Sequence, residues 1–174
     1  WKWVTEYTLS KTSVFIGDCE TVKKKALQFG FLENRIFLFP WGIDLKQYQP
    51  KYNASFRNKL GWADKFVLLS LRSWEKIYGV DIVAKAFVAA SLAEPELRLI
   101  LLGRGTQEPV IMKIFEDAGM KDRVYFGGVI TQNNLPDYYQ AADLYLSASR
   151  SDGSSVSLME SLACGLPVLV SDIP

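Results

Sequence analysis

The 174 residues predict an α/β protein with a Rossmann-like, doubly wound parallel sheet. Short apolar runs, typical of buried strands, alternate with segments in which apolar residues recur at helical spacing. The strand runs are almost continuously apolar, as expected for a parallel sheet that helices cover on both faces. In such a sheet ligands bind beyond the carboxyl ends of the strands, so the loops that follow the strands form the candidate site.

The first fifty residues are predicted to hold two short strands with a helix between them. The strand candidates are 13–16 and 36–39. The helix is expected to begin after Asp18, a suitable N-cap, and to end at Gly30. The polar stretch 46–55 that follows is the best linker candidate.

The rest of the chain predicts strands and helices in regular alternation. Its five strand runs are 66–71, 97–102, 124–126, 143–147 and 168–171. Its helices are expected over 80–90, 111–118 and 135–142, with a last one beginning near Ser154. Because parallel strands end at one edge of a sheet, four loops are expected to meet there. These loops are 72–76, 103–107, 127–130 and 148–153.

Composition excludes several classes of protein. A net charge of +1 with no basic face argues against a nucleic-acid partner, and the run 23–25 of lysines is expected to be a solvated helix face. No apolar run approaches the roughly 20 residues that span a bilayer. Two cysteines and no histidine provide no disulfide framework, zinc site or histidine-activated nucleophile. We expect a cytoplasmic protein, with peripheral membrane attachment of the full-length protein left open.

The most informative run is 152–170, in which Asp152 and Glu160 lie eight positions apart. On a helix that begins near Ser154, the side chains of Ser157, Glu160 and Cys164 share one face. The opposite face, which we expect to face the core, holds Val156, Met159, Leu162 and Ala163. The amino end of this helix offers backbone N–H groups to anions and sugar hydroxyls. A carboxylate at Glu160 suits two vicinal hydroxyls, such as those of a ribose.

This run resembles the acidic-x7-acidic signature of the family 4 retaining glycosyltransferases, which have the two-domain GT-B fold. The common form there is Glu-Gly-Phe-Gly, then apolar residues and Glu-Ala-Met-Ala-Cys-Gly-x-Pro-Val. Here Glu160, 163–165 and 167–168 match, while Asp152 replaces the first Glu and Ser154-Ser155 replaces Phe-Gly. The resemblance implies that residues 1–50 are the tail of an N-terminal domain with the crossover. Residues 51–174 would then be an incomplete donor-binding domain.

The resemblance also implies roles for the loop after the strand 66–71. Arg72 and Lys76 would hold the donor diphosphate and stabilise the charge that grows on the departing phosphate. Here Arg and Lys stand one residue closer than in the family, and Ile77-Tyr78 is inserted before Gly79. Asp152 would face the transferred sugar. These three charged residues, Arg72, Lys76 and Asp152, are the catalytic candidates.

Further residues are implied to bind the donor nucleotide. Glu160 would hold the ribose hydroxyls, and Val129 with Ile130 would contact the base. The sugar and the distal phosphate would be bound by the N–H groups of Gly153, Ser154, Ser155 and Val156. The implied substrate is a nucleoside-diphosphate sugar, bound without metal, and no cofactor is implied. The nucleotide base, the sugar, the acceptor and the oligomeric state cannot be deduced from the sequence.

By resemblance, the intact enzyme would transfer a sugar to an acceptor hydroxyl with retained anomeric configuration. A carbohydrate or lipid-linked acceptor would bind through the N-terminal domain, so this chain alone is expected to be inactive. Two alternatives stay open. One is a non-hydrolysing nucleotide-sugar epimerase of the same fold, against which the lack of histidine counts. The other is a non-catalytic nucleotide-binding module.

Overall fold

The computed structural model describes residues 1–173, which form two compact units. Unit 1 contains residues 1–42 and 152–156, and unit 2 contains residues 43–151 and 157–173. The expectation that residues 1–50 and 51–174 are separate domains stays a prediction. Across the described span, no helix combines the length and apolar character needed to cross a bilayer.

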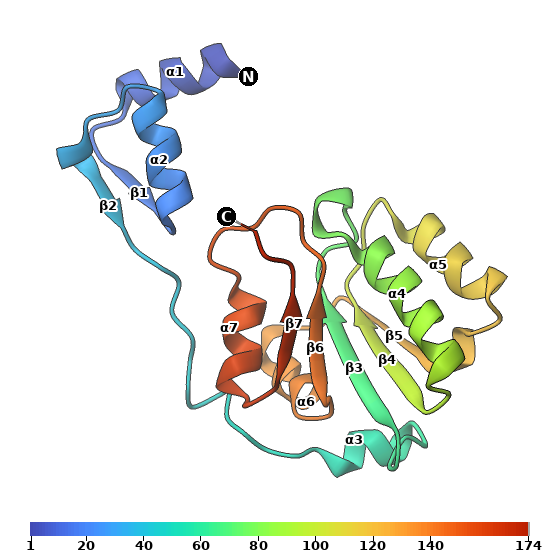
Figure 1. Ribbon diagram of the computed structural model, residues 1–174. Helices are drawn as coiled ribbons and strands as arrows, with labels where there is room; N and C mark the ends of the chain where they lie inside the picture. The colour runs from blue at the N-terminus through green and yellow to red at the C-terminus, as the bar shows by residue number, and fades with distance from the viewer. Residues whose placement is uncertain (174) are drawn as a thin grey trace. The chain divides into compact units, whose positions relative to one another are not determined.

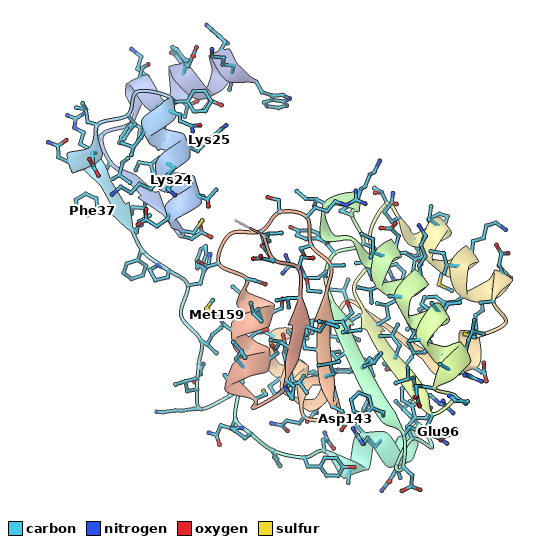
Figure 2. The ribbon with its side chains drawn as sticks, in the orientation of Figure 1. Lys24, Lys25, Phe37, Glu96, Asp143 and Met159 are labelled. Atoms are coloured by element: carbon cyan, nitrogen blue, oxygen red, sulfur yellow. The ribbon has the colours of Figure 1, made fainter. Side chains whose placement is uncertain are left out.

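Unit 1 holds two α-helices, the 3-10 helix η1 (Glu33–Arg35) and a two-stranded parallel sheet. Strand β1 (Phe15–Gly17) pairs with β2 (Ile36–Leu38), and α2 (Glu20–Gln28) lies between them in the chain, as predicted. Helix α1 (Lys2–Lys11) was not predicted, because it buries none of its residues and so has no apolar face. Lys24 and Lys25 are exposed on α2 (Figure 2), as expected for a solvated face.

Unit 2 is built on a five-stranded, wholly parallel sheet with the strand order β5-β4-β3-β6-β7. The strands are β3 (Phe66–Leu71), β4 (Leu97–Leu102), β5 (Val124–Gly128), β6 (Leu144–Ser147) and β7 (Val168–Val170). From β3 the chain builds outward through β4 to β5, then returns to the other side of β3 with β6. This reversal is the topological switch point of a Rossmann-like sheet, and it lies between β3 and β6.

Helices cover both faces of this sheet (Figure 1). One face carries α4 (Val80–Ala93) and α5 (Glu108–Asp117), and the other carries α6 (Leu135–Tyr139) and α7 (Val156–Ala163). Alternate residues of β3 enter the two cores: Val67 and Leu69 pack with Tyr139, whereas Leu68 packs with Phe87. The near-continuous apolar strands are thus explained, since both of their faces are buried.

A short helix, α3 (Ala54–Lys59), begins inside the stretch that was predicted to be a linker. Asn53 is its N-cap, with a side-chain oxygen that accepts a hydrogen bond from the N–H of Phe56 at 3.2 Å. Asparagine is common both in loops and at N-caps, so Asn53 was interpreted as part of a linker and the helix was missed.

The predicted orientation of α7 is wrong. Ser157, Glu160 and Cys164 are buried, whereas Val156 and Leu162 are 36% and 56% exposed. The polar face turns inward because buried tyrosine hydroxyls supply its hydrogen bonds: Tyr145 Oη lies 2.8 Å from Ser157 Oγ. A buried polar side chain is tolerated when it is hydrogen-bonded in this way.

Candidate functional site

Arg72 lies directly after β3, at the switch point, and is fixed from two sides. Its Nη1 donates to Ser157 Oγ of α7 at 3.1 Å. Its guanidinium carbon lies 4.4 Å from the centroid of the Tyr78 ring, a cation–π contact. Tyr78 belongs to the two-residue insertion noted in the sequence, so the insertion supplies a support for the arginine.

Lys76 is the first residue of the short 3-10 helix η2 (Lys76–Tyr78), and its side chain is exposed. Among residues 1–173 it forms no ion pair. The exposed ammonium of Lys76, in the same loop as Arg72, is accessible to an anionic group.

The loops that follow β3 and β4 are joined by Trp74. Its ring is only 2% exposed, and its Nε1 donates to the carbonyl of Leu102 at 3.0 Å. Its backbone N–H donates to the carbonyl of Arg104, and its own carbonyl accepts from Gln107. Trp74 therefore packs and positions the two loops, and it presents no ring surface to a ligand.

A surface hollow of about 180 Å³ opens at the carboxyl ends of β3, β4 and β5. It is lined by Leu71, Arg72, Ser73, Leu102, Gly103, Gly128, Val129, Ile130 and Leu135. The structure therefore brings Arg72 together with Val129 and Ile130, which the sequence predicted for the phosphate and the base. The wall is mostly apolar apart from Arg72 and Ser73.

Glu160 lies on α7 with only 2% of its surface exposed. Its Oε2 accepts a hydrogen bond from Tyr139 Oη at 2.7 Å, and its Oε1 accepts from Gln132 Nε2 at 2.7 Å. Burial, together with the neighbouring Glu160 carboxylate, raises the pKa of both Tyr139 and Tyr48 above the ordinary value. Both phenols therefore stay protonated, and Tyr139 acts as a hydrogen-bond donor to the carboxylate.

Sequence reasoning missed Gln132 and Tyr139. Gln132 opens the 3-10 helix η4 (Gln132–Asn134), two residues beyond the predicted loop 127–130. Because Gln132 follows the end of β5, a predicted loop extended by two residues would have included it. Tyr139 lies within a predicted helix, and nothing in its local pattern distinguishes it from an ordinary core residue.

Ser157 joins the two charged parts of the site. Its Oγ accepts from Arg72 and contacts Tyr145 Oη, while its carbonyl oxygen lies 3.2 Å from Tyr139 Oη. Tyr139 in turn donates to Glu160. Arg72 and Glu160 are thus held by a single helix through a continuous hydrogen-bond network.

Asp152, Gly153, Ser154 and Ser155 belong to unit 1. Two of the N–H groups predicted to hold a ligand already have carboxylate acceptors: Gly153 donates to Asp152 Oδ1 at 3.1 Å, and Ser154 donates to Asp18 Oδ2 at 3.0 Å. The bond from Ser154 is the main cause that lowers the pKa of Asp18 below its ordinary value. These two N–H groups are thus hydrogen-bonded within the protein, and their predicted contacts with a sugar or phosphate stay a prediction.

The family model of the group 1 glycosyl transferases matches residues 53–174. This chain belongs to the group 1 glycosyltransferases. It is 30% identical over 154 residues to the mannosylfructose-phosphate synthase of Agrobacterium fabrum. That match covers 82% of the chain but 34% of the synthase, so the chain spans about a third of this relative's length.

Solved glycosyltransferase structures share the fold. The Anabaena protein Alr3699/HepE, in complex with UDP and glucose, superposes with a TM-score of 0.82 at 19% identity, covering 99% of this chain and 49% of that one. The C-terminal domain of the group 1 glycosyl transferase LpcC from Francisella tularensis gives a TM-score of 0.67 at 19% identity, covering 74% of this chain and 70% of that one. The chain therefore has a Rossmann-like architecture that corresponds to about half of a GT-B protein.

Proposed function

We propose that this chain is the donor-binding, C-terminal part of a family 4 retaining glycosyltransferase. One observation carries the proposal: Arg72, which lines the hollow at the switch point, is hydrogen-bonded to Ser157, and Glu160 lies one turn further along the same helix. A cation for the diphosphate and a carboxylate for the ribose are thus fixed relative to each other. A nucleoside diphosphate offers a partner to each, anionic phosphates to the cation and ribose hydroxyls to the carboxylate.

The proposed chemistry assigns the charged side chains to the departing diphosphate. Arg72 and Lys76 neutralise it, and they stabilise the charge that grows as the glycosidic bond breaks. Two cations neutralise this charge without a metal ion. With retention, the acceptor attacks on the face from which the phosphate leaves, and the departing phosphate oxygen takes the acceptor proton. Val129 and Ile130 form the wall for the base.

The transferred sugar is assigned to Asp152 and to the N–H groups of residues 153–156. The acceptor, a carbohydrate or a lipid-linked sugar, is assigned to an N-terminal domain of the full-length protein. We place that protein in the cytoplasm or at its membrane surface. UDP is the first nucleotide to test, because the structurally similar HepE binds it.

The test is calorimetric titration of this chain with UDP, GDP and ADP, each with and without a chelator. We expect binding of one diphosphate, unaffected by the chelator. The 2′,3′-dideoxy form of that nucleotide should bind about tenfold or more weakly, since a site built to bind hydroxyls leaves its carboxylate unsatisfied without them. Equal affinity for the ribose and dideoxyribose forms would contradict the assignment of Glu160.

Two variants, with a third as the control, test the individual assignments. Glu160→Gln should lose most of the discrimination between ribose and dideoxyribose, whereas Glu116→Gln, an exposed carboxylate on α5, should keep it. For the sugar, Asp152→Ala should weaken binding of UDP-glucose more than binding of UDP. If Asp152→Ala weakens neither, the non-catalytic nucleotide-binding module becomes the better account. Sugar transfer by this chain alone would contradict its expected inactivity.

A further inference from the structure

Two of the groups that hydrogen-bond to the Glu160 carboxylate, Tyr139 and Gln132, have very different surroundings. Tyr139 is 1% exposed and lies in the core between α6 and the sheet, in contact with the rings of Tyr48 and Tyr145. Gln132 is an exposed residue of η4 on the loop after β5. Tyr139 is therefore a fixed donor, and Gln132 is one that a rotation of its side chain can remove.

The amide of Gln132 covers the outer side of the carboxylate. Its Nε2 donates to Glu160 Oε1 at 2.7 Å and to Tyr48 Oη at 2.8 Å, which uses both of its hydrogens. Because a carboxylate accepts and cannot donate, the amide nitrogen and not the amide oxygen must face Glu160. With this contact Glu160 is 2% exposed, so no ligand hydroxyl can reach Oε1 until the amide moves.

We propose that Gln132 is a placeholder that occupies the position of a ribose hydroxyl on Glu160 and is displaced when the donor nucleotide binds. This inference rests on the proposed function, in which Glu160 holds the ribose. An amide N–H and a hydroxyl O–H are equivalent donors to Oε1, so the exchange keeps the buried carboxylate satisfied in both states. While the site is empty, the Gln132 amide keeps Oε1 of the buried carboxylate hydrogen-bonded.

A placeholder has a consequence for affinity that a supporting residue does not. The closed position of Gln132 is a binding-incompetent state, and the apparent affinity is reduced by the fraction of molecules in which the amide has moved away. Removing the amide should therefore strengthen nucleotide binding. If Gln132 instead held Glu160 in its binding orientation, removing it would weaken binding.

As a placeholder, Gln132 would also increase the preference of the site for ribose over dideoxyribose. A nucleotide with both hydroxyls replaces the bond that Gln132 gives up, whereas a dideoxynucleotide displaces the amide and returns nothing to Oε1. The discrimination between the two should therefore be greater with Gln132 than without it. Exposure of Gln132 on the surface means that its substitution is compatible with folding.

The experiment compares Gln132→Ala with the present chain in titrations with UDP and 2′,3′-dideoxy-UDP. The Kd for UDP should fall about two- to tenfold, a change that corresponds to the net free energy of one hydrogen bond. The Kd for dideoxy-UDP should fall by more. Asn133→Ala, the next exposed residue of η4, is the matched control for a general loosening of the loop and should leave both Kd values unchanged.

A second measurement follows the amide directly. The side-chain NH₂ resonances of Gln132, assigned by their loss in Gln132→Ala, should shift when UDP is added and should shift less with dideoxy-UDP at equal saturation. An unchanged or raised Kd for UDP in Gln132→Ala would overturn the placeholder while leaving Glu160 as the ribose ligand. If the present chain does not distinguish UDP from dideoxy-UDP, the proposed function fails first.

Discussion

Arg57 and Asp143 form an ion pair at the end of the sheet opposite the candidate site, with Nη2 and Oδ2 2.5 Å apart. Arg57 lies on α3 with 6% of its side chain exposed, and its Nε donates to the carbonyl of Ala141 at 2.8 Å. Asp143, at the amino end of β6 (Figure 2), also accepts from the N–H of Val67. The pair joins α3 to the starts of β3 and β6.

Replacing Asp143 with Asn should destabilise the fold, because it leaves the Arg57 cation buried without its counter-charge. We expect a loss of about 2–3 kcal/mol in the free energy of unfolding, below the value for a fully buried pair since a third of Asp143 is exposed. Urea denaturation measures this loss. Nucleotide affinity should not change, since the pair lies at the other end of the strands.

The control for this prediction is Glu96→Gln, which removes the partner of Lys65 in a surface ion pair (Figure 2). Glu96 is 63% exposed, and surface pairs contribute less than about 1 kcal/mol. Similar losses in Asp143→Asn and Glu96→Gln would show that burial of Arg57 does not set the strength of the first pair.

Glu75 provides a pH-dependent contact between the loops that follow β3 and β4. Its Oε2 accepts from Thr106 Oγ1, and its Oε1 accepts from the N–H of Thr106 at 2.9 Å. These bonds, the side-chain bond first, lower the pKa of Glu75 below its ordinary value of 4.5. The stabilisation is therefore present above 4.5 and is lost as the pH falls through the lowered pKa of the folded state.

Because the pKa of Glu75 is lowered, the effect of Glu75→Gln on stability should depend on pH. Relative to the present chain, the variant should be less stable near neutral pH, and the difference should shrink as the pH is lowered toward about 3. Urea denaturation over this range measures the difference. Glu94→Gln, an exposed carboxylate at the end of α4, should give a smaller and flatter difference. A Glu75→Gln difference that is constant from neutral to acid pH would contradict the role of the carboxylate.

The strands of unit 2 were the part of the fold best predicted from the sequence. β3 and β4 were predicted to the residue, because a strand buried on both faces is a nearly continuous apolar run, here broken only by Ser70 and Arg98. α7 was predicted to begin in the right region but with its faces reversed. Its own sequence shows Ser157 and Glu160 as polar, and only the distant tyrosines that bond them explain why they are buried.

In the candidate site, too, positions along the strands could be predicted from the sequence, but contacts between different elements could not. Arg72, Val129 and Ile130 were predicted to share an edge because parallel strands end together, and they line one hollow. The contact of Gln132 with Glu160 joins residues 28 positions apart on different elements. Periodicity and motif spacing describe one element at a time, so side-chain pairs between elements could not be predicted from them.

Gly79 allows the two loops of the switch point to touch. It ends η2 in the left-handed conformation, with φ of 60°, and a Cβ placed on it would lie 2.1 Å from the carbonyl oxygen of Ala148 after β6. Next to this contact, the N–H of Arg150 donates to the carbonyl of Ile77 at 2.8 Å. A side chain at position 79 would therefore force apart the loops that hold Arg72 and Lys76 on one side and Ala148 on the other.

Gly79→Ala should consequently destabilise the fold and weaken diphosphate binding together. Gly119→Ala is the matched control, because Gly119 has φ of 62° and nothing within 4 Å of the added Cβ. The control should lose about 1 kcal/mol from backbone strain alone. Gly79→Ala should lose about 1–3 kcal/mol more from the steric clash, as urea denaturation would measure. Equal losses, with unchanged Kd values for UDP in both variants, would mean that the contact between the two loops neither stabilises the fold nor positions the phosphate ligands.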